Sequence, residues 1–396
     1  MNYKTYPIAD LIDEIAMGPF GSNIKVDCFV DKGIPVLNGS NLEGFELSEK
    51  SFRYVTEEKA DSLKKANAYK GDVVITHRGT LGQIVYIPQT AQRVRYVISQ
   101  SQFRVKCNKK VLPEYFVYYF HTPIGQHKLL SNASQVGVPA LARPSSTFQK
   151  IEIEIPDLET QRKVVKLIGS LQTRIKTNAE INDNLQQQAF SVFDNLIANA
   201  ENNDYTVSDY AFLNPKRTLA KNQVARSIDM SQLSTSGAFP SGWEMKPFNG
   251  GMRFTNGDTL LARITPCLEN GKTAFIDFLD DGEVAFGSTE YIVLAPKNDT
   301  PPEMLYCLAR YPAFVDYAVK NMNGSSGRQR VSAETVGQYR LPLFDKHSLV
   351  LFKEVVSPMF LKMRYNSLEN MRLAELRDAL LPKLMSGEID VSAVQL

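Results

Sequence analysis

Several short polar loops carry amide, hydroxyl and guanidinium groups at spacings that suit hydrogen bonding to a polar ligand. Pro35–Asn41 holds two asparagines and a serine, Thr76–Thr80 holds a histidine and an arginine, and Ser99–Gln102 alternates hydroxyl and amide groups. Asn and Gln can pair with adenine N6 and N7, and Arg with guanine O6 and N7. The loops therefore predict contacts with base edges, while each one alone is equally typical of an ordinary turn.

The same reasoning selects candidate contact residues in both halves of the chain. Serine, threonine and lysine are included because they serve phosphates, which position a protein on nucleic acid. In the first half we expect contacts from Lys25, Asn38, Ser40, Asn41, His77, Arg78, Thr80, Gln100, Gln102, Ser134, Gln135 and Arg143. In the second half we expect them from Arg263, Thr265, Lys272, Ser325, Ser326, Arg328, Gln329 and Arg330.

No sequence pattern predicts catalysis or a bound cofactor. The chain has no G-x-x-x-x-G-K-[ST] segment, and Asn214–Arg217 lacks the second proline and the aromatic ring of an N-P-P-[YF] base clamp. Of the four histidines, His121 and His127 are six apart, so a helix does not bring them together as metal ligands. We therefore expect a binding protein with no catalytic residues and no metal site.

The charges are unevenly distributed along the chain. Ten Lys or Arg residues lie between Lys64 and Lys110, and Asp72 is the only acidic residue among them. Such a field attracts a polyanion, although a solvated basic face is the alternative. The second half has six acidic residues against one lysine between Asp277 and Asp299, and we expect the stretch Asp277–Glu283 to face away from any nucleic acid.

The order of motifs in the first half returns in the second, about 190 residues later. Gly71–Ile75 is matched by Gly257–Leu261, and Pro113–Tyr119 by Pro302–Tyr306. Solenoid repeats have periods of about 20–50 residues, so a repeat of this size indicates a duplicated domain. Val73–Ile75 predicts a strand, and Pro113–Leu130 predicts a helix with proline in its first turn.

Each copy is followed by a long helical stretch with an apolar stripe. About 38 residues of helix measure on the order of 57 Å, and one such helix cannot shelter its own apolar face. We therefore expect the two helices to pack as a coiled coil. Asn178 and Asn366 fall in the stripes, where buried asparagines would fix the register; the alternative is that both point into solvent.

These elements predict an α+β fold with a pseudo-two-fold repeat. Two mixed α/β modules, at residues 1–157 and 201–345, are joined by antiparallel coiled-coil helices at residues 158–200 and 346–396. No apolar run approaches the roughly 18 residues that span a membrane, and no export signal follows Met1, so we expect a cytoplasmic protein without membrane contact.

The motifs in this order resemble the DNA-specificity subunit of type I restriction–modification systems. The resemblance is carried by the G-D segments at Gly71 and Gly257, the P-E helix starts at Pro113 and Pro302, and the closing Leu376–Leu384 helix. It covers nearly the whole chain and occurs in the same order twice. No single motif is specific, and the coverage makes the match.

The resemblance implies a function and a set of partners. Each module would be a target-recognition domain that reads one half of a bipartite site on double-stranded DNA, and the helices would set the spacing. Two adenine-N6 methyltransferase subunits would dock on the chain, and ATP-dependent restriction subunits would join them. S-adenosylmethionine, ATP and Mg would bind those partners rather than this chain. A specificity subunit for a fused, type II-like enzyme and a protein–protein scaffold without a DNA role remain the alternatives.

Overall fold

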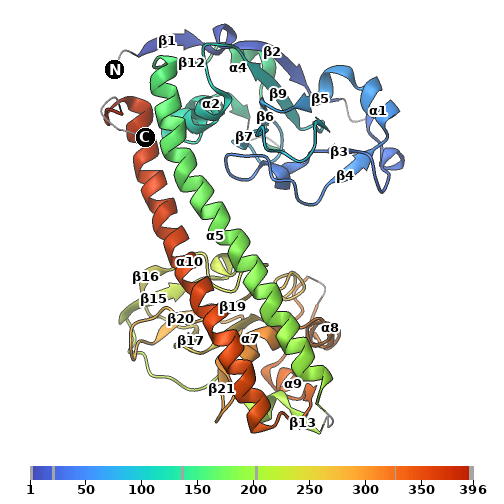
Figure 1. Cartoon of the computed structure of the whole chain (residues 1–396), viewed down its shortest axis with the longest axis vertical. Coiled ribbons are helices and arrows are strands. Elements are labelled where there is room, and N and C mark those ends of the chain that lie inside the picture. The colour runs from blue at the N-terminus through green and yellow to red at the C-terminus, as the bar shows by residue number, and fades with distance from the viewer. Residues whose placement is uncertain (1–2, 20–22, 135–137, 201–203, 326, 392–396) are drawn as a thin grey trace. The chain divides into compact units, whose positions relative to one another are not determined.

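The protein is seen in a computed structural model that describes residues 3–19, 23–134, 138–200, 204–325 and 327–391 (Figure 1). The chain divides into two compact units, each made of a mixed α/β module and segments of two long helices. Unit 1 comprises residues 1–172 and 375–396, and unit 2 comprises residues 173–374.

Unit 1 contains two four-stranded sheets. The first has the order β2 (Ile12–Met17), β9 (Gln102–Cys107), β6 (Asp72–Thr76), β7 (Ile84–Tyr86), and all of its pairs are antiparallel. The second has the order β4 (Arg53–Val55), β3 (Ile34–Val36), β8 (Arg95–Val97), β5 (Asn67–Tyr69). Strands β3 and β8 are its one parallel pair. The strand predicted at Val73–Ile75 is confirmed as part of β6.

Unit 2 repeats both sheets strand for strand. Its first sheet has the order β14 (Ala211–Leu213), β21 (Tyr291–Pro296), β18 (Thr259–Ala262), β19 (Thr273–Phe275). Its second has the order β16 (Glu244–Pro247), β15 (Val224–Ile228), β20 (Ala285–Gly287), β17 (Met252–Phe254). The parallel pair again stands in the middle of the second sheet, between β15 and β20. The duplication read from the sequence is therefore a duplication of topology.

Shorter elements complete each module. Unit 1 has helices α1 (Glu57–Ser62), α2 (Pro113–Phe120), α3 (Pro123–Leu130) and α4 (Pro144–Gln149), the strand pair β1 (Lys4–Pro7)–β12 (Glu152–Ile155), and the hairpin β10 (Ala133–Ser134)–β11 (Ala140–Leu141). Unit 2 has helices α6 (Val207–Tyr210), α7 (Pro302–Arg310), α8 (Pro312–Lys320) and α9 (Ala333–Gly337), and the strand pair β13 (Tyr205–Thr206)–β22 (Arg340–Leu341).

The single helix expected over Pro113–Leu130 is wrong, because the structure has two helices there. Helix α2 ends at Phe120, and the Thr122 hydroxyl caps α3 by accepting a hydrogen bond from the Gly125 N–H at 3.0 Å. Since a residue before proline disfavours the helical conformation, Pro123 starts a new helix rather than extending the old one. The same break separates α7 from α8 at Pro312.

Helices α5 (Leu158–Ala198) and α10 (Lys346–Ser386) are the two long helices, each of 41 residues. Both begin at an aspartate cap: Asp157 accepts from the Thr160 N–H at 2.9 Å, and Asp345, 188 residues later, accepts from the Ser348 N–H at 3.0 Å. Helix α10 continues through Pro358 and ends before Gly387, whose φ is +79°.

The predicted pairing of the long helices is confirmed within unit 2. There the two helices run antiparallel, with Arg174 bonded to Glu369 and Phe193 packed against Phe352. Asn178 and Asn366 are both 1% exposed, so the outward orientation is excluded.

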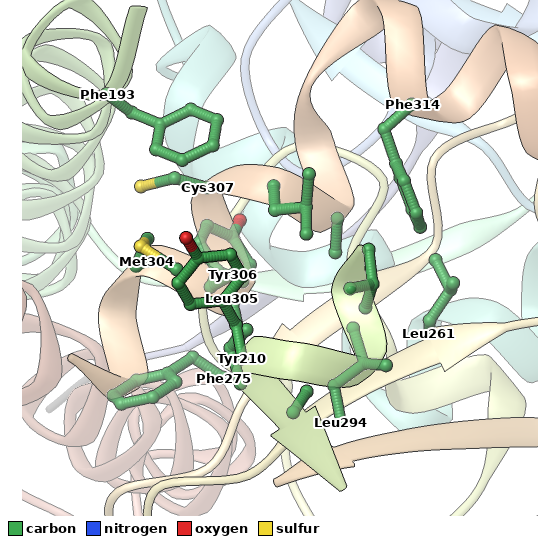
Figure 2. Close-up of a cluster of buried hydrophobic side chains, with 14 of the residues drawn as sticks. Phe193, Tyr210, Leu261, Phe275, Leu294, Met304, Leu305, Tyr306, Cys307 and Phe314 are labelled. Atoms are coloured by element: carbon green, nitrogen blue, oxygen red, sulfur yellow. The ribbon is translucent and has the colours of Figure 1, made fainter. Parts of the chain in front are cut away.

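The largest core of unit 2 joins the module to the long helices. Figure 2 shows aromatic and sulfur-bearing side chains of α7 facing Phe193 of α5. Tyr306, at the centre of α7, is fully buried and stacks near Phe190 and Phe360, whose ring centroids lie 6.2 and 5.5 Å away. Such contacts fix the module to this stretch of the helix pair.

Candidate nucleic-acid interface

One edge of the unit 1 module is built by a hairpin and a turn. The hairpin β10–β11 lies beside the turn that follows β6: the Gly79 N–H donates to Pro139 O at 2.9 Å, and the Leu141 N–H donates to His77 O at 2.8 Å. Arg78 therefore forms a bridge with Ala140. We call this edge, residues 77–80 with 133–143, rim 1.

The equivalent edge of unit 2 has the same hydrogen bonds. The Thr265 N–H donates to Gln329 O at 3.0 Å, and the Val331 N–H donates to Arg263 O at 3.0 Å. Ile264 and Asn323 both form bridges with Arg330. We call residues 263–266 with 323–331 rim 2. The correspondence between these loops that the sequence predicted is confirmed at the level of backbone pairing.

Some of the predicted contact residues lie exposed at the rims or at the neighbouring turn. The His77 ring Nε2 lies 3.2 Å from Gln100 O, and burial lowers the pKa of His77, so the imidazole is neutral at pH 7. Gln135 and Ser326 lie outside the described residues. The exposed residues are Arg78, Thr80, Gln100, Ser134 and Arg143 in unit 1 and Ser325 and Arg328 in unit 2.

Other predicted contact residues hold their own loop together. Asn38 caps the short 3-10 helix η4 (Gly39–Leu42), and its Oδ1 accepts from the Ser40 N–H at 2.9 Å. Asn41 is fully buried, and its amide donates to Ser48 O and Lys50 O at 3.0 and 2.7 Å. A buried amide with these bonds has no group left for a ligand, so Asn41 shapes the loop and does not contact nucleic acid in this structure.

Gln102 and Lys272 are likewise internal. Gln102 is fully buried, and its Oε1 accepts from the Ser99 N–H at 2.9 Å. Lys272 Nζ donates to Met230 O at 2.7 Å, where Gln83 in unit 1 donates to Gly39 O at 2.9 Å. Both side chains brace a turn against the second sheet of their unit.

Three further candidates stand apart from the exposed set. Lys25 is exposed but precedes η3 (Val26–Cys28), in a segment separate from rim 1 along the chain. The Thr265 hydroxyl donates to Gln329 O at 3.3 Å and so ties the two strands of rim 2 to each other. Arg263 Nε is buried and has no hydrogen-bond partner among the described residues.

The basic stretch of unit 1 is only partly available to a ligand. Arg95 pairs with Asp61 at 2.7 Å. Arg104 is buried between Glu14 at 2.9 Å and Asp72 at 3.4 Å, and its side chain is 6% exposed. These two arginines stabilise the module rather than a complex. Exposed cations of the stretch are Lys64, Lys65, Arg78, Arg93, Lys106, Lys109 and Lys110.

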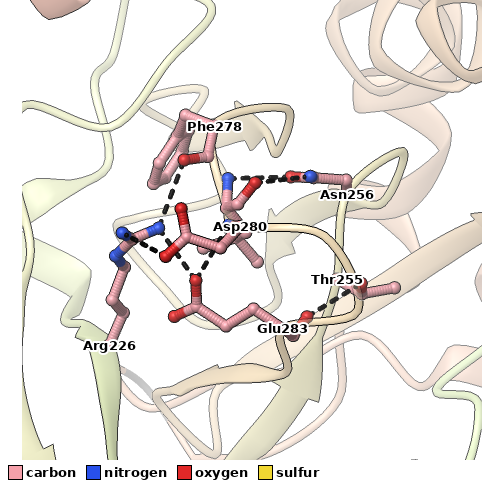
Figure 3. Close-up of polar contacts among 7 residues, drawn as sticks. Arg226, Thr255, Asn256, Phe278, Asp280 and Glu283 are labelled. Carbon is pink, nitrogen blue, oxygen red and sulfur yellow. Dashed lines mark hydrogen bonds and ion pairs between the residues drawn. The ribbon is translucent and has the colours of Figure 1, made fainter.

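The acidic stretch of unit 2 is largely neutralised by arginines of the same unit. Figure 3 shows Arg226 reaching both Asp280, at 3.1 Å, and Glu283, at 2.9 Å. Asp277 pairs with Arg364 of α10 at 3.2 Å. Three of its carboxylates thus have cationic partners, which weakens their repulsion of a polyanion.

The two G-D motifs are explained by a turn that each module needs. Gly71 and Gly257 have φ of +89° and +88°. The aspartate that follows accepts a backbone N–H three residues back, from Tyr69 at 3.0 Å in unit 1 and from Thr255 at 2.8 Å in unit 2. The buried Asp258 is paired with Arg217 at 2.7 Å. The motif is therefore structural.

An apolar groove lies between the end of α5 and the start of α10, inside unit 2. Its volume is about 540 Å³, and Leu196 forms part of its wall. Leu343, Leu351 and Val355 also line it and are 46–47% exposed. Neighbouring apolar side chains exposed to this degree are typical of a surface that binds another protein.

Comparisons with known proteins identify the family. A family model for the type I restriction modification DNA specificity domain matches residues 5–187. The specificity subunit of the type I restriction enzyme HindI from Haemophilus influenzae is 23% identical over 405 residues, covering 81% of this chain and 87% of that protein. The MjaIX specificity subunit from Methanocaldococcus jannaschii is 21% identical, covering 96% and 92%. The chain belongs to the type I DNA-specificity family.

The fold of this type I specificity chain agrees with a solved relative. The S subunit of a type I restriction–modification system from M. genitalium covers 97% of this chain and 96% of its own, with 14% identity and a TM-score of 0.58. The α+β fold with two long helices is thereby confirmed. Type I specificity subunits recognise DNA sequence and have no catalytic role of their own.

The described residues also bear on metal binding and on membrane insertion. Within the described ranges, no group of three or more His, Cys, Asp or Glu side chains is placed to hold a metal ion. Among the helices that the structure describes, none combines the length and the apolar character needed to cross a membrane.

Proposed function

We propose that the two modules, residues 1–157 and 201–345, each read one half of a bipartite site on double-stranded DNA. The helices at residues 158–200 and 346–396 set the distance between the half-sites and dock two methyltransferase subunits. Adenine methylation, with S-adenosylmethionine, takes place on those subunits, and the restriction subunits use ATP and Mg. This chain supplies sequence recognition to the complex in the cell's cytoplasm.

The observation that carries the proposal is the recurrence of the rim. Two edges with the same backbone hydrogen bonds occur 186 to 190 residues apart, between Gly79 and Thr265 and between Pro139 and Gln329. Their side chains differ, with Arg78 on rim 1 and Arg328 on rim 2. A shared backbone with different side chains is what two readers of different half-sites need.

The long helices support the ruler function. A helix of 41 residues measures about 60 Å at 1.5 Å per residue. Half-sites one turn of DNA apart are separated by roughly 34–36 Å, which such helices can accommodate. The asparagine pairs between α5 and α10 in unit 2 give the helix pair one register, which a ruler requires.

The docking of partners is supported by the groove lined by Leu343, Leu351 and Val355. Its exposed apolar side chains lie on the helix pair and not on a rim, so a protein bound there leaves the rim free. Because the helices repeat after 188 residues, one chain can offer similar surfaces to two identical partners.

The decisive experiment is to map methylated sites. The chain is produced with its methyltransferase partner, and methylated adenines are located by sequencing in a library of random DNA. We expect a motif of two short specified parts separated by unspecified positions. A contiguous motif, or methylation without a motif, would contradict bipartite reading.

Exchanging one module tests whether the readers are independent. Residues 1–157 are replaced by the module of another family member, and in a matched variant residues 201–345 are replaced instead. Each exchange should change one half of the motif and leave the other half intact. If either exchange altered both halves, the modules would not read separately.

Lengthening a helix tests the ruler. Four residues inserted after Leu171 add one helical turn, about 5–6 Å. The gap between the specified halves should lengthen, or activity should be lost. The same four residues inserted at Gly242, where no atom lies within 4 Å of the point that a Cβ would occupy, should leave the gap unchanged. An unchanged gap after the first insertion refutes the ruler.

Salt dependence separates DNA reading from a scaffold function. Phosphate contacts release counterions, so retention of the complex on duplex DNA should fall steeply between 50 and 200 mM salt, by about 10³-fold or more for six contacts. A scaffold with a solvated basic face would show no retention at either salt concentration.

A further inference from the structure

Arg330 of rim 2 is held by four hydrogen bonds. Its Nε lies 3.0 and 2.9 Å from the two carboxylate oxygens of Glu290, and its Nη2 donates to Glu290 Oε1 at 2.7 Å. Its Nη1 donates to the backbone carbonyl of Arg328 at 3.1 Å. The bonds from Arg330 lower the pKa of Glu290, so this carboxylate is ionised at neutral pH.

The turn that carries Arg328 is fixed at its backbone. The Arg328 N–H donates to Ser325 O at 3.0 Å, and Gly327 has a φ of +80°, as the third residue of a type II turn has. At Gly324, with φ of +130°, a Cβ would come within 3.0 Å of Arg328 O. Arg328 is thus held through both its N–H and its carbonyl group.

The side chain of Arg328 is the opposite case. It is exposed, and within the described residues its guanidinium makes no hydrogen bond or ion pair. A fixed backbone under a free guanidinium is the arrangement expected of a pre-organised contact, because less conformational freedom is lost on binding. The exposed hydroxyl-bearing Ser325 in the same turn suits a phosphate oxygen.

We propose that Arg330 is a positioning residue, anchored by Glu290, which orients Arg328 for contact with a DNA phosphate. This inference rests on the proposed function and assigns different tasks to two arginines that the sequence placed together. In the described part of rim 1 there is no such clamp, since the positions equivalent to Glu290 and Arg330 are Ser101 and Ala140. The clamp therefore belongs to the module with the acidic stretch, where fewer cations face a ligand.

Binding of the full-length chain to a mixed-sequence 30-base-pair duplex, with its methyltransferase partner if needed, tests the inference across salt concentrations. Arg328→Gln should weaken binding about tenfold and reduce the salt slope by about 0.9, as the loss of one phosphate contact does. Glu290→Gln and Arg330→Gln should each weaken binding. In the Arg328→Gln background, neither should weaken it further, because the clamp acts only through Arg328.

Two controls make the test sharp. Lys346→Gln, which removes an exposed cation paired with Asp299 at the start of α10, should leave the slope unchanged. Hydrogen exchange of residues 322–331 should rise equally in Glu290→Gln and Arg330→Gln and not in Arg328→Gln. This second measurement needs no DNA and reports the clamp itself.

The contrary results are distinct. If Arg330 contacts DNA and Glu290 masks it, Glu290→Gln will tighten binding and steepen the slope, which overturns the inference. Additive losses in the Arg328→Gln background overturn it as well. If the unsubstituted chain with its partner retains no duplex at low salt, the proposed function fails, and the DNA contact of Arg328 fails with it.

Discussion

Asn178 on α5 donates through its side-chain amide to Oδ1 of Asn370 on α10, at 2.9 Å. The repeat returns the same bond with the helices exchanged: Asn366 on α10 donates to Asn182 on α5 at 2.8 Å. Each pair is extended by a bond to the opposite backbone, from Asn370 to Ile175 O at 3.1 Å and from Asn182 to Met363 O at 3.2 Å. The helix pair therefore has a local two-fold axis of amides.

The asparagine pairs should be energetically coupled. Asn178→Ala or Asn370→Ala alone leaves a buried amide without its partner, and each should lower the free energy of unfolding by about 1–3 kcal/mol. The double variant should cost less than the sum, by about 0.5–3 kcal/mol, in urea denaturation. Asn184→Ala, at an exposed position of α5, is the control and should cost nothing measurable. Strict additivity would show that the pair does not interact.

Arg104 and Arg78 should respond oppositely to substitution. Arg104→Met leaves Asp72 buried without its cation and should lower the free energy of unfolding by about 3–5 kcal/mol. It should not change the salt slope of DNA binding. Arg78→Gln, at an exposed position, should leave thermal stability unchanged and reduce the slope by about one. A slope change in Arg104→Met with an intact fold would place Arg104 at the interface.

Asp258 should make unit 2 less stable as pH rises from 4 to 6. Burial raises the pKa of Asp258 to about 6, in spite of the ion pair with Arg217. The folded state then holds the proton more tightly than the unfolded state, so the contribution is greatest below the unfolded pKa near 4 and declines up to pH 6. In urea denaturation the difference between the unsubstituted chain and Asp258→Asn should fall by on the order of 1–3 kcal/mol over this range.

Asp209 provides a control of opposite sign. Hydrogen bonds from Thr206 lower the pKa of this helix-capping carboxylate. Its contribution to stability is therefore present above the unfolded pKa and is lost as pH falls through the folded value. Asp209→Asn should cost stability at pH 7 and cost less at pH 3. The same pH trend in both variants would mean that the assignment for Asp258 is wrong.

The glycine of the G-D motif should be required for its backbone and not for its size. Gly257 has φ of +88°, while the nearest atom to an added Cβ is Pro302 Cγ at 3.8 Å, an ordinary contact. Gly257→Ala should therefore lower the free energy of unfolding by about 1–2 kcal/mol through backbone strain alone. Gly242→Ala, with open space and no positive φ, should be neutral by thermal denaturation. Equal effects would exclude the strain explanation.

The sequence by itself determined the features that depend on local order. The duplicated motifs, the long amphipathic helices and Asn178 and Asn366 in their apolar stripes follow from residue type and spacing, because periodicity fixes which face of a helix is buried. The register of the repeat was also readable, and it led to the pairing of the loop at Gly324–Arg330 with the loop at Ser134–Arg143.

Only the tertiary structure decided which polar side chains are free. Asn41, Gln102 and Lys272 have the residue types of a DNA contact, yet their hydrogen bonds are satisfied inside their own unit. Arg328 and Arg330 stand two residues apart, and Glu290, 40 residues away from Arg330, separates their tasks. Hydrogen bonding and ion pairing join residues that are distant in sequence, so composition and spacing contain no record of which donor is already used.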